Sequence, residues 1–403
     1  MRRLGFGLSR ELWLVQVGIF LNTFGWGAVL PFEVIYLHDG RGFSLGLAGL
    51  VVGTLTGVAV VSAPLAGPLI DRFGARTVAA VAGLALAAGY AGLAFAQTPA
   101  AAFAAATLAG AGNGALGPAQ STLLAALAPS ELRHRATAVS RVCTNVGFGL
   151  GGAVGGFVAA SGLNGLIALF LVNAASYLLY VGVLLAVVRE SPPAEHVPGG
   201  YRVVLRDRPF LHLALTNVAI IAVGWGVLPW LVPPYATSEI GIDAQLIGLL
   251  MLANAATVVV AQVPIAKAAE GRRRVVMIAL GSSIFAGSCL LVVVAGATPS
   301  AAYLTLVLAS VAIGVGECFH SAALMPLVAE LAPAGLRGRY MATIGLSWWI
   351  GLAVAPTAGA QVLSLSPAVA FLGAGAVALT AAGSALALER ELPAQARVTP
   401  QPG

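Results

Sequence analysis

Long apolar runs separated by short polar breaks occupy almost the whole chain, and the charged residues fall mainly in the breaks. A helix that crosses a bilayer needs roughly 20 apolar residues, and in lipid only helices or closed barrels satisfy every backbone polar group. Only 9% of the 403 residues are charged, whereas a soluble domain carries about 25%. The sequence therefore predicts an all-α polytopic membrane protein whose surface faces membrane lipid.

The apolar runs predict twelve transmembrane helices. Turn or charge signals mark the breaks, for example HDGRGFS at 38–44 and EGRRR at 270–274. The first run is too long to be the ~7–15-residue apolar core of a signal peptide. We place the helices at 12–37, 45–70, 77–96, 100–128, 136–160, 165–188, 209–236, 244–268, 275–296, 301–331, 339–363 and 367–388.

The basic residues indicate how the chain is oriented. Of the 21 Lys and Arg residues, all but two fall on one side of the predicted membrane; Arg41 lies on the other side and Arg141 within a span. Cytoplasmic loops carry the excess of Lys and Arg, so both termini are predicted to be cytoplasmic. The excess of Arg over Lys and the many Ala residues suggest a high-GC bacterium, and hence the plasma (bacterial inner) membrane. Because the net charge of +6 is spread over these loops, we expect no nucleic-acid partner.

An internal repeat divides the chain into two related halves. LAPSELRHRATA at 127–138 matches LAPAGLRGRYMA at 331–342, and GWG occurs at both 25–27 and 224–226. Two six-helix halves with parallel internal similarity are typical of a large class of secondary transporters. The predicted organisation is an N-terminal six-helix bundle at 1–188, a cytoplasmic linker at 189–208 and a C-terminal six-helix bundle at 209–403.

The loop between the second and third predicted helices reads GPLIDRFGAR at 67–76. It resembles motif A of the major facilitator superfamily, G-x-L-x-D-R-x-G-x-R/K, and the matching residues are Gly67, Leu69, Asp71, Arg72, Gly74 and Arg76. The resemblance covers essentially the whole chain and implies the fold of two six-helix bundles, in which this loop is a cytoplasmic gate. It further implies that Asp71 faces a helix N-terminus near 337–340, while the two arginines pair with acids or carbonyl ends.

The fifth predicted helix is rich in glycine and resembles motif C of the same superfamily, which is associated with exporters. The match departs at Gly152, where the motif has a proline, and Ala106 stands where motif B of drug exporters has a basic residue. The residues that carry the motif C resemblance could instead form an ordinary helix-packing surface. They are Gly147, Gly151, Gly155, Gly156 and, in the second half, Pro356. Taken over the whole chain, the sequence resembles the twelve-span drug/proton antiporter group.

Two acids within predicted spans are candidates for proton coupling or substrate binding, because ionisable groups are costly in lipid. Glu33 shares a helical face with Asn22 and Trp26; the alternative is that it reaches external water at the helix end. Glu317 lies near the middle of the tenth span, with His320 on the same side of the helix. Its carboxyl could alternate between protonated and ionised forms; the alternative is a purely structural Glu317–His320 pair.

Arg141 in the fifth span could reach the membrane interface, pair with an acid such as Glu131, or contact substrate. Other polar and aromatic residues are candidates for lining the substrate cavity. The asparagines could equally make helix–helix hydrogen bonds, and the tryptophans could be interfacial anchors. The candidates are Asn22, Trp26, Asn113, Gln120, Asn145, Asn217, Asn254, Trp225 and Trp349.

Together these features predict a secondary active transporter rather than an enzyme. No metal-ligand spacing and no phosphate-binding loop occurs, so we expect no metal and no cofactor. Two acids and one base within the spans favour neutral or cationic substrates over anions. The leading hypothesis is a monomer that exports a small apolar or cationic molecule in exchange for protons by alternating access. The alternative is an uptake or facilitative carrier with the same fold.

Overall fold

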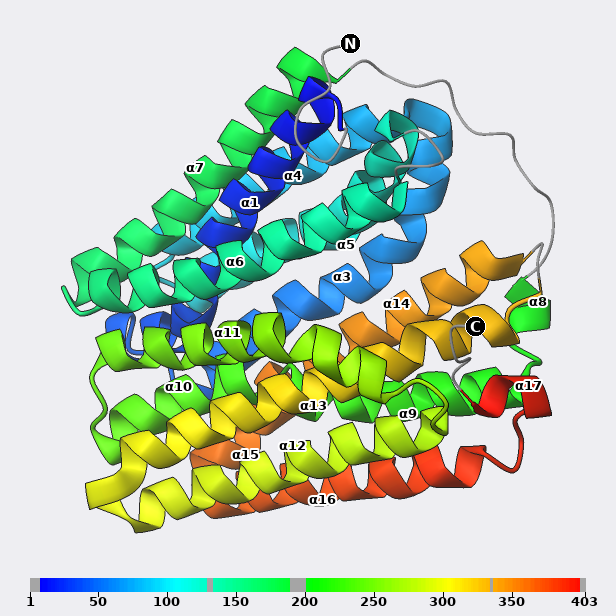
Figure 1. Ribbon diagram of the computed structural model, residues 1–403. Coiled ribbons are helices and arrows are strands. Elements are labelled where there is room, and N and C mark those ends of the chain that lie inside the picture. Colours follow the sequence, from blue (N-terminus) through cyan, green and yellow to red (C-terminus); the bar gives the residue numbers. More distant parts are fainter. Residues whose placement is uncertain (1–7, 129–132, 189–200, 334–335, 399–403) are drawn as a thin grey trace. The chain divides into compact units, whose positions relative to one another are not determined.

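The computed structural model describes residues 8–128, 133–188, 201–333 and 336–398. Within these ranges the chain is helical throughout, apart from turns and one isolated bridge between Arg273 and Val398 (Figure 1). The side chains of a few residues, among them Asp71 and Arg337, lie outside the described part. The all-α fold expected from the apolar runs is confirmed.

The first half consists of six long helices, the first of which continues through three short segments. In chain order the elements are α1 (Arg10–Val29), η2 (Leu30–Phe32), α2 (Glu33–Ile35), η3 (Tyr36–Gly40), α3 (Leu45–Phe73), α4 (Ala75–Phe95), α5 (Pro99–Leu127), α6 (Arg133–Ala159) and α7 (Leu163–Val187).

The second half repeats this order after a short connecting helix. Its elements are α8 (Tyr201–Val204), α9 (Arg208–Gly224), η5 (Val227–Leu231), α10 (Val232–Tyr235), η6 (Ala236–Ile240), α11 (Ala244–Ala268), α12 (Arg274–Ala297), η7 (Pro299–Ala301), α13 (Ala302–Leu331), α14 (Arg337–Val354), η9 (Ala355–Gly359), α15 (Ala360–Leu365), α16 (Pro367–Leu388) and α17 (Ala394–Arg397). Helix α8 lies within the predicted linker, of which residues 189–200 are outside the described part.

Each of the twelve predicted spans coincides with a helix or with a run of consecutive helical segments. Among the described residues, eleven of these are long and apolar enough to cross a membrane. The exception is α5, which has 29 residues but whose glycines, Pro118 and Asn113 lower its hydropathy. The chain is therefore a multi-pass membrane protein.

Polar residues in the breaks begin the next helices. The side chains of Ser44, Thr98 and Ser366 each accept a hydrogen bond from a backbone N–H in the first turn of α3, α5 and α16, which is the usual role of an N-cap residue. Gly74, between α3 and α4, has a φ of 82°, a conformation that residues with a Cβ rarely adopt. This explains why the break at 71–76 requires glycine at that position.

Prolines interrupt three of the long spans. Pro31 lies in a 3₁₀ segment after α1, Pro229 in a π-helical segment after α9, and Pro356 in a π-helical segment after α14. A proline cannot donate the helical hydrogen bond, and its ring crowds the preceding turn. The regular α-helix changes to 3₁₀ or π geometry at these three sites, whereas Pro118 and Pro326 lie within continuous α-helices. The three spans continue to Gly40, Ile240 and Leu365.

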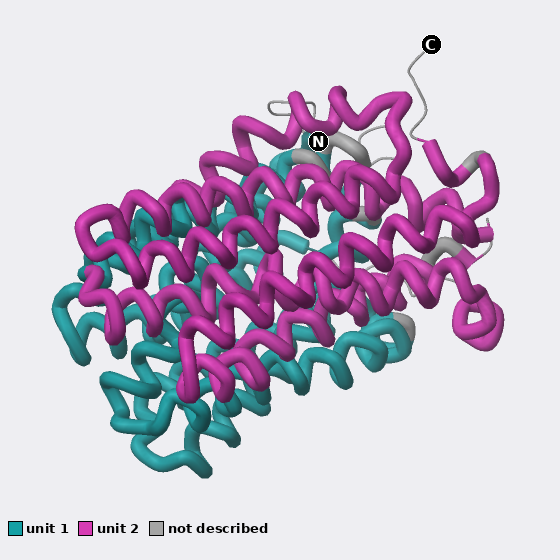
Figure 2. Tube along the Cα trace, turned by 90° about the horizontal axis from the view of Figure 1, so that it is seen from below, with its two compact units in different colours: residues 1–196, 243–252 teal, residues 197–242, 253–403 magenta. Residues whose placement is uncertain are grey.

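The chain forms two compact units (Figure 2). Unit 1 comprises residues 1–196 and 243–252, and unit 2 comprises residues 197–242 and 253–403. The predicted division of the sequence placed 243–252 in the C-terminal half. These residues group with unit 1 because Gly248 of α11 lies directly against the backbone of Gly152 and Gly156 on α6.

The internal repeat is visible in the packing of each unit. In unit 1, α1 packs against α6 and α7, and α4 packs against α5 and α7. In unit 2, α9 packs against α14 and α16, and α12 packs against α13 and α16. These helices correspond in chain order, so these four helix pairs occur in both halves.

Large apolar side chains are exposed along the helices. Leu365 is 86% exposed, Val260 75% and Leu215 71%. Soluble monomers rarely expose extended apolar surface, whereas in a membrane such side chains contact lipid tails. The exposed apolar surface agrees with the low charge content of the sequence.

Candidate functional site

The carboxyl group of Glu317 lies in unit 2, near the middle of α13. The side-chain amide of Asn254 on α11 donates a hydrogen bond to Glu317 Oε1 at 3.0 Å. The indole of Trp225, directly after α9, lies close to the same carboxyl. Both neighbours are neutral, and no Lys or Arg in the described part of the chain forms an ion pair with Glu317. The carboxyl therefore has a hydrogen-bond partner but no fixed counter-charge.

His320 lies one turn further along α13 and is only 2% exposed. Both of its ring nitrogens are without a hydrogen-bond partner among the described residues. Glu317 and His320 therefore do not form the structural pair that was the alternative expectation. A buried polar group without a partner costs about 1–3 kcal/mol, so this imidazole is a group that a ligand or a water molecule would stabilise.

Aromatic rings surround this pair of ionisable residues. The Trp225 ring lies 5.3 Å from His320, 5.0 Å from Trp348 and 5.7 Å from Phe285, between ring centroids. Trp225 was a sequence candidate, but Trp348 rather than the candidate Trp349 joins this cluster. We refer to Glu317, His320, Trp225, Trp348 and Asn254 as the Glu317 cluster.

Asn217 on α9 makes a helix–helix contact. Its Nδ2 donates to Ser347 Oγ of α14 at 2.8 Å, while its Oδ1 has no partner in the described structure. Asn217 thus makes a helix–helix hydrogen bond, which was one of the two roles expected for the asparagines. Asn217 thus positions α14, which carries Trp348.

In unit 1, the carboxyl of Glu33 lies inside the helix bundle. Glu33 is 2% exposed, and the hydroxyl of Tyr90 on α4 donates to its Oε1 at 3.0 Å. The Tyr90 ring is stacked on that of Tyr177 of α7, with 6.2 Å between centroids. The alternative that Glu33 reaches external water at the helix end is therefore wrong, because its side chain points into the bundle.

Several amides in unit 1 are buried without hydrogen-bond partners. Asn22 Nδ2 and Gln120 Nε2 have none among the described residues, and on Asn173 neither Nδ2 nor Oδ1 has one. Asn173 is fully buried on α7 and faces Gly25 of α1. Asn173 was not among the sequence candidates, although an asparagine in the middle of an apolar span is the kind of signal that would have identified it.

The other polar candidates of unit 1 are more accessible. Arg141 is exposed, and Asn145 donates from Nδ2 to the Arg141 carbonyl at 3.0 Å. Asn113 on α5 is half-buried, and no hydrogen bond of its side chain is found in the described structure. Trp26 packs against Phe148 with 5.4 Å between centroids. The proposed partner of Arg141, Glu131, lies outside the described residues.

The loop that resembles motif A connects α3 to α4. Arg76 Nη2 donates to the carbonyl of Leu185 near the C-terminal end of α7 at 2.8 Å, a favourable place for a cation because helix C-termini carry partial negative charge. Arg72 is exposed, and a methyl group at Gly67 would meet open space. The expected contact of Asp71 with 337–340 concerns side chains outside the described part.

The glycines of α6 face α1 and α11. A Cβ at Gly151 would collide with the carbonyl oxygen of Phe24, and one at Gly155 with that of Ala28. A Cβ at Gly147 would crowd Thr23, whereas Gly156 faces the start of α11 at Gln245. These glycines allow two helix backbones to approach within contact distance.

Comparison with known proteins places this geometry in context. The sequence model of the Major Facilitator Superfamily matches residues 16–232 and 213–403. The chain is 25% identical over 364 residues to the uncharacterized MFS-type transporter YqjV of Bacillus subtilis (strain 168), covering 88% of this chain and 86% of the relative. It is 26% identical over 366 residues to YttB, another uncharacterized MFS-type transporter of that organism, with 87% and 88% covered.

Among solved structures, a POT family transporter in complex with 5-aminolevulinic acid superimposes with a TM-score of 0.81, covering 96% of this chain and 98% of that chain. The sequence identity in this superposition is 13%, so the likeness concerns the fold. These matches agree with the two six-helix halves and the motif at 67–76.

Proposed function

This chain belongs to the Major Facilitator Superfamily, and from that premise we propose that it exports small apolar or cationic compounds in exchange for protons. It is a membrane transporter rather than an enzyme. The observation that carries the proposal is the Glu317 cluster, in which a carboxyl has a neutral hydrogen-bond donor, Asn254, and aromatic rings around it. Gating by alternating access would expose this carboxyl first to one side of the membrane and then to the other.

Proton coupling is supported by the hydrogen-bond partners of Glu317. A fixed cation would hold the carboxyl permanently ionised, but Asn254 and Trp225 carry no charge. The carboxyl can therefore gain and lose a proton without leaving an unpaired arginine or lysine behind. If Glu317 releases its proton to one side of the membrane and then binds a cationic substrate at the same carboxylate, proton transport and substrate transport are coupled.

The substrate class is supported by the rings around the carboxyl. Aromatic faces attract cations, by about 0.5–2 kcal/mol per contact, and provide flat apolar surface for neutral ligands. Trp225 and Trp348 offer such faces beside the carboxylate, while His320 offers ring nitrogens with hydrogen-bonding capacity to spare. A small aromatic amine or an apolar cation suits these groups better than an anion.

The remaining parts of the proposal concern gating and orientation. We assign Asp71, Arg72 and Arg76 to a cytoplasmic gate, with both termini in the cytoplasm of a bacterial cell and the transporter acting as a monomer. The basic residues of the 71–76 and 270–274 loops support this orientation. Glu33 is a second candidate for proton binding, since it too is buried and bonded to a neutral donor, Tyr90.

An uptake or facilitative carrier is the alternative function. It is favoured by one feature of α6: Gly152, which stands in place of the proline of the exporter motif, continues the regular helix and lies against Met251. A facilitative carrier would move its substrate without any proton movement. A proton-coupled uptake carrier would move substrate and proton in the same direction. Direction of transport therefore has to be measured.

The test uses the purified protein in proteoliposomes with an imposed pH gradient and a trapped pH dye. Wild type is compared with Glu317→Gln and with Glu270→Gln, an exposed acid in the loop before α12. We expect neutral and cationic amphiphiles to trigger proton leak in wild type and Glu270→Gln, and none in Glu317→Gln. Substrate flux without any proton movement would overturn proton coupling and favour the facilitative carrier.

A further inference from the structure

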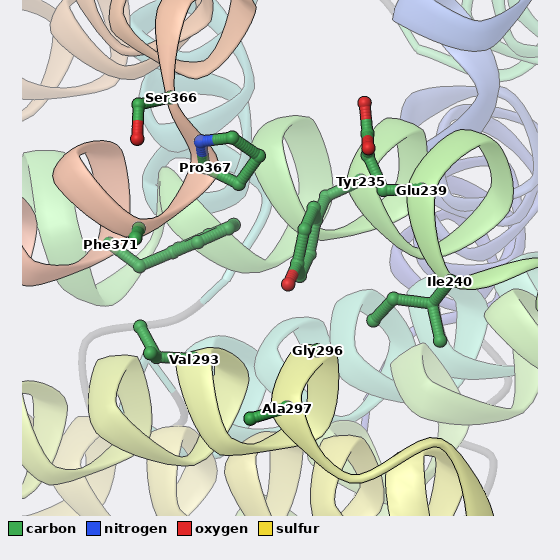
Figure 3. A pocket seen from close by; sticks show the side chains of 10 residues that line it. Tyr235, Glu239, Ile240, Val293, Gly296, Ala297, Ser366, Pro367 and Phe371 are labelled. Carbon is green, nitrogen blue, oxygen red and sulfur yellow. The ribbon is translucent and has the colours of Figure 1, made fainter.

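A separate pocket of about 420 Å³ lies at one end of unit 2, away from the Glu317 cluster. Its walls come from the end of the seventh span at Tyr235 and Glu239, the end of α12 at Gly296, and the start of α16 at Ser366 and Phe371 (Figure 3). These are the helix ends opposite the basic loop at 270–274. On the orientation proposed above, the pocket opens at the outer face of the membrane.

Tyr235 is the central polar group of the pocket. It is 7% exposed, and its hydroxyl has no hydrogen-bond partner in the described part of the chain. Figure 3 shows this hydroxyl turned towards Val293 and Gly296 of α12, and a Cβ at Gly296 would collide with it. Glycine at 296 thus leaves room for an unpaired hydroxyl that a ligand could engage.

The charge of the pocket favours a cationic group. Glu239 lines it and forms no ion pair among the described residues, and no Lys or Arg occurs in the sequence from 209 to 266 or from 275 to 336. The rings of Tyr235 and Phe371 lie 5.0 Å apart and offer faces to a cation. A carboxylate and a hydroxyl oxygen together suit an ammonium that can donate several N–H hydrogen bonds.

A phosphate beside that ammonium would also find a partner. The helix α16 has 22 residues, and Ser366 Oγ accepts the N–H of Val369 in its first turn. Pro367 has no N–H, and the N–H of Ala370 donates to the Ser366 carbonyl, so the N–H of Ala368 is the one left over in this turn. An N–H at a helix N-terminus favours anions, and Ala368 lines the pocket.

The surface next to the pocket is apolar and exposed. Three large apolar side chains at the start of α16 are exposed: Leu365 by 86%, Val369 by 59% and Leu372 by 47%. They alternate along the chain with the pocket residues Ser366, Ala368 and Phe371. In a membrane these side chains contact acyl chains. A ligand with a zwitterionic head and apolar tails would therefore satisfy the pocket and the adjacent surface together.

We propose that this pocket binds the head group of a phosphatidylethanolamine lipid from the outer leaflet. The ammonium lies at Glu239 and the Tyr235 hydroxyl, the phosphate lies at the start of α16, and the tails lie along Leu365 and Val369. Phosphatidylcholine fits less well, because its trimethylated nitrogen has no N–H to donate to these two oxygens.

Native mass spectrometry of the full chain in mild detergent tests this, with phosphatidylethanolamine and phosphatidylcholine of identical acyl chains as probes. We expect wild type to bind phosphatidylethanolamine about tenfold more tightly, as loss of a hydrogen bond to a charged group predicts. Glu239→Gln should abolish this preference, and the control Glu270→Gln should retain it. Ala297→Trp, which fills the pocket, should weaken the binding of both lipids.

Equal binding of the two lipids by wild type, or an unchanged preference in Glu239→Gln, would overturn the proposal. Displacement of phosphatidylethanolamine by dodecylammonium at lower concentration would instead assign the pocket to free cationic amphiphiles. Because these measurements record binding without transport, they are independent of whether the protein proves to be an exporter.

Discussion

Asn254 on α11 and Glu317 on α13 are joined by a hydrogen bond of 3.0 Å, although 63 residues separate them in the sequence. The same amide also lies 3.4 Å from the carbonyl oxygen of Ser310, two helical turns before Glu317. Asn254 therefore fixes the side chain that we assign to proton coupling, and it does so without adding charge.

Replacing Asn254 by Leu should reduce proton-coupled transport about tenfold or more. Hydrogen bonds to charged groups are worth roughly 1.5–3 kcal/mol, and the ionised carboxylate would lose the hydrogen bond from Asn254. The pH-dye assay in proteoliposomes measures this. Thr257→Ala is the matched control, since Thr257 bonds only to the carbonyl of Ala253 on its own helix; equal rates in both variants would contradict the role of Asn254.

Replacing His320 by Leu should separate stability from function. A buried imidazole with two unpaired nitrogens contributes little to folding, and an apolar side chain of similar size can be neutral or stabilising there. We expect the melting temperature in detergent to stay constant or rise while transport of cationic substrates falls. A large loss of stability would show that His320 has a structural partner instead.

Replacing Tyr90 by Phe should destabilise the protein by about 1–3 kcal/mol, because the buried Glu33 carboxyl loses the hydrogen bond from the Tyr90 hydroxyl. Thermal unfolding in detergent is the measurement. Tyr201→Phe provides the control, since Tyr201 is 51% exposed. If both variants melt like wild type, Glu33 does not depend on Tyr90.

Replacing Gly151 by Ala should weaken the packing of α6 on α1. The added methyl group meets the Phe24 carbonyl, and overpacking typically costs about 1–3 kcal/mol. Gly182→Ala on α7 is the matched control, because a Cβ there meets nothing within 4 Å. Melting temperatures that are equal in the two variants would show that α6 can shift without cost.

Replacing Asp71 by Asn should slow transport without altering the order of preference among substrates. The proposed gate residue contacts no substrate, so every compound should be affected in the same proportion. Initial rates for a panel of neutral and cationic compounds measure this. A changed ranking of the compounds would refute the assignment of Asp71 to the gate.

The twelve helices could be predicted because lipid imposes one simple requirement on each of them, a run of apolar residues of sufficient length. The ends were less predictable: the first span was expected to end at 37 but continues to Gly40 through the polar residues His38 and Asp39. Hydropathy alone also fails for α5, whose sequence is dominated by small residues.

The site could be predicted only in part, because it depends on packing between distant segments. Glu317 was identified because ionisable residues are rare within spans, and Trp225 because it lies nearer the middle of its span than a membrane-interface anchor would. Asn254 was one of several asparagines, and nothing in the sequence linked it to Glu317. The choice between Trp348 and Trp349 depends on helical phase: the buried face of α14 includes Ser347, and Trp348 rather than Trp349 contacts Trp225.

The proline breaks after α1 and α9 have a mechanical consequence. A regular helix is stiff along its length, but a segment of 3₁₀ or π geometry joins two stretches that can bend relative to each other. The stretch before each break is anchored by its bundle, as α1 is by the glycines of α6. The stretch after the first break is fastened as well, because Glu33 accepts from Tyr90 and Tyr36 donates to the carbonyl oxygens of Leu93 and Ala94, all on α4. A bend at Pro31 would therefore carry the end of α4 with it, so that the two segments would move together.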